Sequence, residues 1–354
     1  MERPTIRDIA TVAGVSPSAV SFALNGRSGV SQTTRRRILA VANEMGWTPN
    51  AAARALSASR AGAIGLVIAR PSQSVAAERF FFEFILGMQA ALTSAGVALL
   101  LQIVTDPAQE IATYRTWWSQ HRVDGVVVVD PRREDPRLAS LAELGLPYVL
   151  VGERDEAGMP SVIGDEEGMI EIVITHLLEQ GRRRIAYMSG MSTLLHTERR
   201  SAAMASLGRS RGVEIMVSTA PDYTERSGAQ ATTELIAGPR SPDAIVYDNE
   251  VLAVGGLTAL RQEGRHPGAD IALVSLEDSP LCRALSPSLT SVHREPAIMG
   301  DTATRLLLEH LSQQGSRPRE DSRAVQCAAP SLIIRDSSPA SDSPAPEGGT
   351  RAVR

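Results

Sequence analysis

Polar side chains gather where short apolar runs end in the long middle part of the chain. Arg70 follows the run 63–69, Asp130 ends the run 125–130, and Glu277 comes shortly after the run 271–274. Comparable positions are held by Glu153, Arg154, Arg199, Tyr223, Asn249 and Glu250. Guanidinium, carboxylate and amide groups bond paired hydroxyls, and an aromatic ring covers the apolar face of a sugar. This combination predicts a recognition site for a polyhydroxylated small molecule.

Three of these residues also have a purely structural interpretation. Arg199 is compatible with an exposed position at the start of a helix, because arginine is common on protein surfaces. Asn249 is a good N-cap for a helix beginning near Glu250. Tyr223 fits loop packing, since tyrosine favours half-buried sites. The sequence leaves both interpretations open at these positions.

The elements that must position these side chains alternate between strand-like and helix-like stretches. Expected strands are 63–69, 97–103, 125–130, 148–151, 185–188, 244–247 and 271–274. Expected helices are 81–94, 166–179, 250–263 and 296–312. Repeated β-α units form parallel sheets with helices on both faces. The predicted fold class is therefore α/β, with a two-lobed, doubly wound core over residues 62–335 and a ligand cleft at the carboxyl ends of its strands.

A different pattern occupies residues 1–48, where three short helices are expected. Thr5 can cap the first helix, Gly14 supplies a turn, and Ser16 with Pro17 begins the second helix. A third helix starts at Ser31 and runs to Gly46. Two short helices joined in this way form either a plain structural hairpin or a DNA-reading helix-turn-helix.

Charge favours the DNA-reading alternative. Residues 1–60 hold eight arginines and three acidic residues, a net charge of +5 in a chain whose total is −4. A basic head on an acidic body is expected when only the head touches a polyanion. The second helix should present Pro17, Ser18, Ser21 and Phe22 outward, with Asn25 at its end. Phenylalanine can pack on a thymine methyl but cannot pair with a guanine edge as arginine does.

Three further motifs carry a resemblance to a known family. They are TIRDIATVAGVSPSAVSFALNG, SQTTRRRILAVANEMGW and TPNAAARALSASRAGAIGLV, all within the first 67 residues. Together they resemble the lac/galactose repressor family, and the similarity continues to about residue 335. The resemblance implies a homodimer that binds a pseudo-palindromic operator in double-stranded DNA, with a core like that of periplasmic binding proteins. It also implies a hinge helix at 49–61, formed against DNA, whose Leu56 enters the minor groove.

The same resemblance assigns roles in the cleft. ERRSAAMASL resembles the family's Arg-x-x-Gly helix start and places Arg199 at the effector-contacting arginine, with Ala202 in place of glycine. Tyr223 matches a ring-stacking aromatic, and Asn249 with Glu250 matches an Asn-Asp pair. Glu277 lies where an aspartate is usual. The implied effector is a small molecule, a sugar or sugar derivative, and the implied function is repression of carbohydrate uptake or catabolic genes.

The sequence gives little support for a membrane protein, an exported protein or an enzyme. No apolar run reaches the roughly 18 residues of a membrane helix, and no export signal is recognised at the N-terminus. Two cysteines indicate a reducing compartment, so a cytoplasmic location is expected. The chain has no lysine, no metal-ligand spacing and no Gly-x-Ser-x-Gly turn, so neither enzyme activity nor a metal or cofactor is expected. The Ser- and Pro-rich tail 336–354 should be disordered.

Two alternatives remain open at this point. A solute receptor that feeds a transporter has a similar two-lobed core, but it needs neither a DNA-reading head nor a cytoplasmic location. The second alternative keeps DNA binding and gives the cleft a non-sugar effector, or makes the protein an activator at some sites.

Overall fold

The computed structural model describes residues 4–24, 28–47, 60–220, 222–313 and 324–339. The chain divides into two compact units, Met1–Ala61 and Gly62–Arg354. Asn25, Leu56 and residues 49–59 of the predicted hinge helix lie outside the described residues. No helix within the described ranges is both long and apolar enough to cross a membrane.

The first unit is the predicted three-helix head. Its helices are α1 (Ile6–Ala13), α2 (Pro17–Leu24) and α3 (Gln32–Glu44). Thr5 and Asp8 form a reciprocal capping box at the start of α1, and Gly14 ends that helix in the left-handed conformation at φ 64°. The side chain of Ser16 accepts the amide hydrogen of Ala19 at 3.2 Å. The caps therefore fix the turn between α1 and α2 locally, as their residue types predict.

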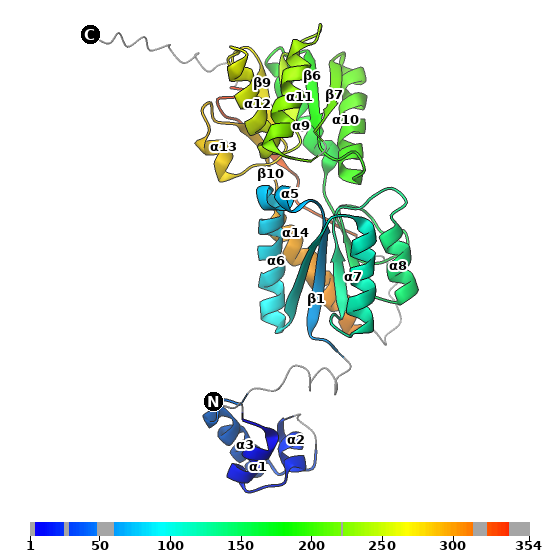
Figure 1. The fold of residues 1–354 in the computed structure, drawn as a ribbon, viewed down its shortest axis with the longest axis vertical. Helices are drawn as coiled ribbons and strands as arrows, with labels where there is room; N and C mark the ends of the chain where they lie inside the picture. The colour runs from blue at the N-terminus through cyan, green and yellow to red at the C-terminus, as the bar shows by residue number, and fades with distance from the viewer. Residues whose placement is uncertain (1–3, 25–27, 48–59, 221, 314–323, 340–354) are drawn as a thin grey trace, which may run out of the picture. The chain divides into compact units, whose positions relative to one another are not determined.

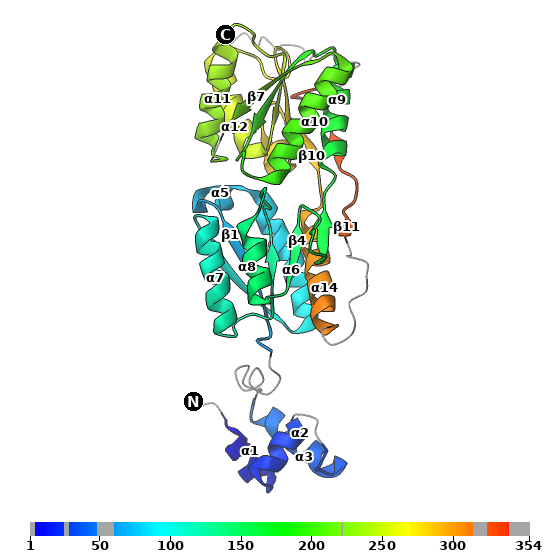
Figure 2. The ribbon, with the colours of Figure 1, turned by 90° about the vertical axis from the view of Figure 1, so that its right-hand side faces the viewer.

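The second unit contains two α/β lobes, seen from two directions in Figures 1 and 2. The strands of lobe 1 are β1 (Ala63–Ala69), β2 (Ala98–Val104), β3 (Gly125–Val128), β4 (Tyr148–Val151), β5 (Ser161–Ile163) and β11 (Ala324–Gln326). Its helices are α5 (Ser72–Ala77), α6 (Arg79–Ala95), α7 (Pro107–Ser119), α8 (Pro136–Leu144) and α14 (Pro296–Ser312). The strands are all parallel, in the order β11-β5-β4-β3-β1-β2. Helices α6 and α14 cover one face of this sheet, and α7 and α8 cover the other.

Lobe 2 repeats this plan. Its strands are β6 (Arg184–Ser189), β7 (Glu214–Thr219), β8 (Ala244–Tyr247), β9 (Ala272–Ser275), β10 (Thr290–His293) and β12 (Ser331–Ile333). Its helices are α9 (Glu166–Glu179), α10 (Leu195–Arg211), α11 (Glu225–Ala237), α12 (Glu250–Gln262) and α13 (Pro280–Ala284). The strand order is β12-β10-β9-β8-β6-β7, and β12 alone among the described strands runs antiparallel to its neighbour.

The two lobes share a strand order that fixes where a ligand can bind. In chain order the first five strands of each lobe lie as 2-1-3-4-5, so the order reverses between β1 and β3 and between β6 and β8. Open α/β sheets bind ligands outside the carboxyl ends of their strands at this reversal. The chain passes between the lobes near residues 164–165, 294–295 and 327–330. These three crossing segments bring both reversal points to one cleft.

The predicted strands and helices of the core are present, with boundaries that differ by a few residues. The prediction missed β5, β7, β10, β11 and β12. Three of these have only three residues, and the longest apolar runs in β7 (EIMVST) and β10 (TSVH) are three residues and one residue. Such strands lack the continuous apolar run that reveals a buried strand.

The predicted boundary of the disordered tail needs correction. Residues 336–339 are described, and Ser337 and Ser338 are fully buried. The amide of Leu273 donates to the carbonyl of Ser337 at 2.9 Å, and the amide of Thr290 donates to the Ser337 hydroxyl at 2.8 Å. The polar composition of this segment indicated disorder, but its hydrogen bonds to β9 and β10 attach it to lobe 2. Residues 340–354 lie outside the described residues.

Candidate effector-binding cleft and DNA-reading head

The head places most of its predicted contact residues on the surface. Thr5, Ser16, Pro17 and Ser18 are exposed, and Ser21 is half-buried. The ring of Phe22 is 38% exposed and lies against Gly29, where a β-carbon would approach it to 3.2 Å. The exposed end of α2 therefore combines small hydroxyl side chains with one aromatic ring, which suits the floor of a major groove.

The cleft of the core encloses about 610 Å³ of non-protein space, open to solvent. Four predicted residues line it, namely Arg70, Asp130, Tyr223 and Glu277. They come from both lobes, so the structure brings together side chains that lie up to about 200 positions apart in the sequence.

Arg70 organises the side of the cleft formed by lobe 1. Its Nε and Nη2 donate to the two carboxylate oxygens of Asp130 at 2.6 and 2.8 Å, and its Nη1 donates to Glu78 at 2.9 Å. Burial by itself would raise the pKa of Asp130, but Arg70 outweighs it and lowers that pKa to about 2. Burial dominates at Glu78 and raises its pKa to about 8 despite Arg70. Asp130 is thus ionised at neutral pH, whereas Glu78 is mostly protonated.

Asp248 has the corresponding position in lobe 2. It follows β8 at the reversal point, just as Asp130 follows β3. One of its oxygens accepts from Tyr187 and from Arg200, both at 2.6 Å, and the other accepts from Tyr223 at 2.7 Å. Burial opposes its ionisation, yet Arg200 holds the pKa of Asp248 well below its usual range. The pseudo-repeat of the fold therefore places one arginine-paired aspartate on each side of the cleft.

Two residues that face the cleft adopt strained backbone conformations. Asp130 has φ 54° and Tyr223 has φ 56°, values that L-residues other than glycine rarely adopt. Such strain costs on the order of 1–3 kcal/mol and clusters at functional sites. The Tyr223 ring also depends on Gly190, because a β-carbon at that position would lie 1.8 Å from the ring. The fold thus stores strain to present these two side chains.

The crossing segments supply the remaining charges of the cleft. Arg294 donates to Glu277 at 2.5 Å and lies 3.7 Å from Glu166, which also accepts from Arg200 at 2.6 Å. Burial raises the pKa of Glu277, and Arg294 only partly offsets it. His196 lines the same void, and burial together with Arg200 lowers its pKa to about 4. His196 is therefore neutral at physiological pH.

Arg199, predicted to contact the effector, does not line the cleft. Its side chain is 40% exposed and forms an ion pair with Glu153, while Arg200 lines the void instead. Successive residues of a helix point about 100° apart, so an assignment wrong by one residue turns the side chain away from the ligand. The Arg-x-x-Gly pattern fits a start at Arg200 equally well, with Ala203 in the place of glycine.

Asn249 and Glu250 also lie beside the cleft rather than in its lining. Asn249 is the N-cap of α12, since its side chain accepts the amide hydrogen of Leu252 at 3.0 Å. Glu250 is 2% exposed, and burial together with Glu277 raises its pKa to about 7. The capping interpretation of Asn249 is therefore confirmed. Tyr223, in contrast, lines the cleft and is nevertheless 2% exposed, so it combines both interpretations.

Sequence reasoning missed several residues that line the cleft, which are Glu78, Glu166, His196, Arg200, Asp248 and Arg294. Position at the end of a strand was an available signal for Asp248 alone among them. Glu78, Glu166 and His196 lie at or near the starts of helices, Arg200 lies inside α10, and Arg294 lies on a crossing segment. No local sequence pattern gives the direction of these side chains. Within the described residues, no cluster of three or more histidine, cysteine or acidic side chains could hold a metal ion.

Residues 5–50 match the family described as "Bacterial regulatory proteins, lacI family", and residues 174–338 match "Periplasmic binding protein-like domain". The regulator CelR of Thermobifida fusca is 31% identical over 324 residues, which cover 89% of this chain and 94% of CelR. The repressor PurR of Photobacterium profundum is 27% identical over 339 residues, covering 94% of this chain and 98% of PurR.

Solved structures agree with these relatives. The transcriptional regulator CelR in complex with cellobiose is 28% identical and covers 95% of this chain and 100% of its own, with a TM-score of 0.71. The lac repressor dimer bound to operator and an anti-inducer has a TM-score of 0.83 over 96% of this chain and 100% of its own. At 22% identity, that second likeness establishes the fold.

Proposed function

The chain belongs to the LacI family of bacterial regulatory proteins and is a DNA-binding transcriptional regulator. We propose that an uncharged sugar bound in its cleft controls its affinity for DNA. The main support for an uncharged ligand is the set of charged side chains that line the cleft. Four carboxylates (Asp130, Glu166, Asp248 and Glu277) and the mostly protonated Glu78 line the void against three guanidinium groups (Arg70, Arg200 and Arg294). Each of the three arginines already bonds at least one of these carboxylates.

This balance selects among ligand classes. A phosphate or carboxylate ligand would have to displace a carboxylate from an arginine, and it would meet an excess of negative charge. Ionised carboxylates are pure acceptors that bond the hydroxyl groups of a sugar. Tyr223 adds an aromatic ring, although the Arg70 guanidinium lies 5.0 Å from its centroid. An uncharged polyol fits this lining better than an anionic metabolite. CelR, whose complex with cellobiose is solved, is a relative with such a ligand.

On the DNA side we propose contacts from the head and the hinge. The proposed residues are Thr5, Ser16, Pro17, Ser18, Ser21, Phe22, Asn25 and Leu56. The exposure of the first four and of the Phe22 ring supports this assignment. Leu56 is proposed as an apolar wedge in the minor groove, where unstacking one base step costs a few kcal/mol and permits a bend.

We propose that two copies of the chain act together on a pseudo-palindromic operator. An apolar surface on lobe 1 supports a homodimer: Phe82 and Leu86 on α6 are 59% and 52% exposed, and Leu101 and Ile103 on β2 are 42% and 44% exposed. Strand β2 is an edge of its sheet, and it contacts α6. Exposed apolar patches beside a free strand edge are typical of interfaces.

The cleft is proposed to bind rather than to catalyse, because its relatives are regulators and its ionised carboxylates are held by arginines. A regulator of chromosomal genes works where the chromosome lies, so we propose a cytoplasmic location. Repression of carbohydrate uptake or catabolic genes follows from the proposed ligand.

The test selects binding sites from randomised duplex with the full-length protein at one fixed salt concentration, since affinity for DNA depends on salt. We expect a pseudo-palindrome that binds at least about 10³-fold more tightly than random duplex. We also expect cellobiose, as the first candidate sugar, to change that affinity. Selection of no common sequence would refute the proposal of an operator.

Two variants separate the DNA site from the cleft. Leu56→Ala should weaken operator binding while the thermal unfolding of the core stays unchanged. Arg200→Gln should bind the operator normally and lose its response to the sugar. Unchanged operator affinity in the first variant would refute the wedge role, and a full sugar response in the second would refute the cleft assignment.

A further inference from the structure

The cleft is almost filled by the protein itself. Only about 60 Å³ of its non-protein space can hold the centre of a water molecule, which is room for a few waters. Sites that bind small molecules usually offer about 300–1,000 Å³. The two lobes are therefore closed on each other in this structure, and a sugar can enter only when they separate.

One contact between the lobes joins backbone to backbone. The amide of Leu195, at the start of α10 in lobe 2, donates to the carbonyl of Pro131 in lobe 1 at 2.9 Å. Beside it, Arg132 and Leu194 pair as an isolated antiparallel β-bridge, and the Leu194 side chain is fully buried. The first amides of a helix have no acceptor within that helix. Lobe 1 therefore supplies the acceptor that α10 cannot supply for its own first amide.

A second contact between the lobes lies at α5. The hydroxyl of Ser74 donates to the carbonyl of Asp222 in lobe 2 at 2.6 Å, and Ser74 is 1% exposed. The neighbouring Tyr223 ring lies 5.0 Å from the guanidinium group of Arg70, which belongs to lobe 1. Separation of the lobes would break this hydrogen bond and expose the hydroxyl, the ring and the cation to water.

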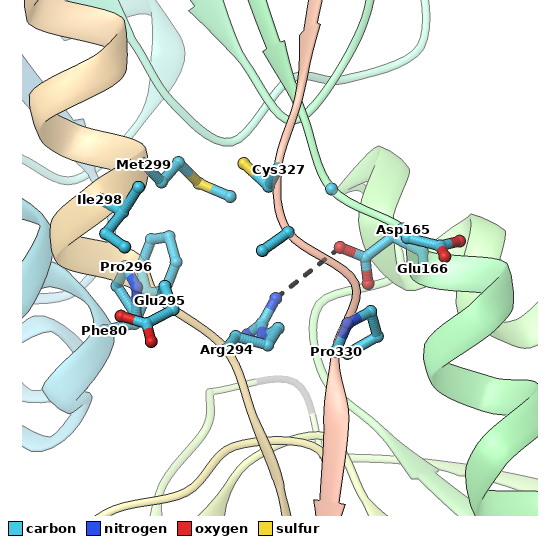
Figure 3. A pocket seen from close by; sticks show the side chains of 12 residues that line it. Phe80, Asp165, Glu166, Arg294, Glu295, Pro296, Ile298, Met299, Cys327 and Pro330 are labelled. Carbon is cyan, nitrogen blue, oxygen red and sulfur yellow. Dashed lines mark ion pairs between the residues drawn. The ribbon is translucent and has the colours of Figure 1, made fainter.

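The crossing segments join the lobes on the side of the cleft away from α5 (Figure 2). Figure 3 shows one of these segments, with the ion pair that Arg294 forms with Glu166 at 3.7 Å. The crossing segments are continuous chain and hold the lobes together in every state. The two contacts described above are hydrogen bonds, which can break and re-form. We call them the latch, which consists of Leu195 with Pro131 and Ser74 with Asp222.

Resting on the proposed sugar-binding cleft, we propose that the latch holds the unliganded protein closed and that a ligand binds by opening it. Two ion pairs across the mouth of the cleft, Arg133 with Glu198 and Arg199 with Glu153, are partly exposed and contribute little. A ligand that binds only the open state has its apparent affinity reduced by the fraction of protein that is open. The strength of the latch therefore sets the ligand concentration to which the regulator responds.

The amide of Leu195 reports the latch in the full-length protein without any ligand. Hydrogen exchange at this amide, followed by NMR, is compared with exchange at Glu225, the exposed first residue of α11. Relative to the intrinsic rates, we expect Leu195 to exchange at least about 10-fold more slowly than Glu225. Exchange of Leu195 at its intrinsic rate would overturn the latch. This measurement needs neither operator nor sugar, so its result is independent of the proposed function.

A second measurement tests the opening. With cellobiose as the probe, calorimetry establishes binding, and saturating cellobiose should then remove at least about 10-fold of the protection at Leu195. Cellobiose that binds and leaves this protection in place would overturn the opening by ligand.

Leu195→Pro removes the backbone donor of the latch. Proline suits the first position of a helix, and Leu194 already has the extended backbone that a following proline requires, with φ −93° and ψ 134°. The proline ring would also crowd the carbonyl of Pro131, which now accepts the amide hydrogen. We expect the variant to bind cellobiose at least about 5-fold more tightly, because more of the protein is open before the ligand arrives.

Two further variants separate the latch from general damage to the fold. Leu195→Ala is the matched control, since it shortens the same side chain and keeps the amide, so its affinity should stay within about twofold of the wild type. Ser74→Ala removes the other contact and should tighten binding at least about twofold. A merely structural role predicts weaker binding, so unchanged or weaker binding by both Leu195→Pro and Ser74→Ala would refute the latch. If Leu195→Pro does not fold, Ser74→Ala and exchange in the wild type still decide.

Discussion

The second unit contains two similar networks of buried ion pairs, one closed by protein atoms and one that borders the cleft. In lobe 1, Arg137 donates to Glu110 at 2.9 Å and to Asp135 at 2.6 Å, and all three side chains are at most 1% exposed. The cleft network around Arg70, Arg200 and Arg294 uses the same ion pairs but borders a void. The first network is closed by protein atoms on every side, and the second has one side left for a ligand.

The difference shows how a binding site is distinguished from a structural network. Arg137 also donates to the carbonyls of Val129 and Asp130, so its hydrogen bonds end on the backbone that carries a cleft residue. Strained backbone occurs in the cleft at Asp130 and Tyr223, whereas a carboxyl of raised pKa occurs in both networks, at Glu78 and at Glu110. Buried ion pairs alone therefore do not mark a site. Charge, strain and an adjoining void together do.

The largest expected effect comes from breaking the closed network. Arg137→Met leaves Glu110 and Asp135 buried without their cation, which should cost about 3–5 kcal/mol in the free energy of unfolding. Urea denaturation measures this loss. Arg305→Met is the matched control, because Arg305 forms an exposed ion pair with Asp301, and exposed pairs contribute little to stability. A loss below about 1 kcal/mol in Arg137→Met would erase the contrast between the networks.

Breaking the cleft network should cost stability too, because Asp248 is fully buried, but it should in addition weaken binding of the sugar. Arg200→Gln removes the cation shared by Asp248 and Glu166, so we expect sugar affinity to fall at least about 10-fold, or 1.4 kcal/mol. Its neighbour provides the control, since Arg199→Gln alters an exposed pair and should change affinity less than twofold. Calorimetry compares both variants. A larger effect from Arg199→Gln would restore the original assignment of the effector arginine.

His196 should make the stability of the protein depend on pH, and a substitution at this position can isolate that contribution. Its pKa is about 4 in the folded protein and 6.5 in the reference state, so the unfolded chain binds a proton that the folded protein does not. Stability from this group is complete above pH 6.5 and is lost as pH falls toward 4. His196→Gln should reduce the stability difference between pH 7 and pH 5 by about 2 kcal/mol at most. Unfolding curves that keep the same pH slope in both proteins would contradict the buried, neutral histidine.

A single added methyl group tests the role of the Tyr223 ring. Gly190→Ala puts a β-carbon within 1.8 Å of the Tyr223 ring, so the ring must leave Asp248 and Arg70. We expect sugar affinity to fall by about 10-fold, or 1.4 kcal/mol. Gly238→Ala is the control, because its nearest atom is 3.3 Å away and its backbone suits alanine. Wild-type affinity in Gly190→Ala would show that the ring is not needed for recognition.

How well the sequence predicts each region depends on how far apart in the sequence the interacting residues lie. The caps at Thr5 and Ser16 and the turn at Gly14 are set by neighbours within four residues, so the head was predicted almost completely. Arg70 and Asp130 were found because a residue after a buried strand must lie at the sheet edge. The choice between Arg199 and Arg200, in contrast, depends on the rotation of α10, which lobe packing sets.

Asp248 and Ser337 are two further residues whose positions local sequence does not predict. The aspartate was overlooked because its neighbour Asn249 is a better cap and a closer match to the family pattern. The serine lies in a segment whose composition is that of a disordered tail, yet strands β9 and β10 bind it. Partners far away in the sequence override local composition at both positions.

The path of the chain between the lobes also affects how the protein folds during its synthesis. Helix α14 completes lobe 1, and Gly300 in it lies against the carbonyl of Phe84 in α6, where any β-carbon would come within 2.1 Å. Lobe 2 is inserted in the sequence between β5 and α14. At about 5–20 residues per second, the ribosome needs roughly seven to thirty seconds to add lobe 2 and α14, and until then α6 alone covers its face of the lobe 1 sheet. During that interval the apolar residues that α14 will cover stay exposed, so we expect the nascent chain to be prone to aggregation until α14 is made.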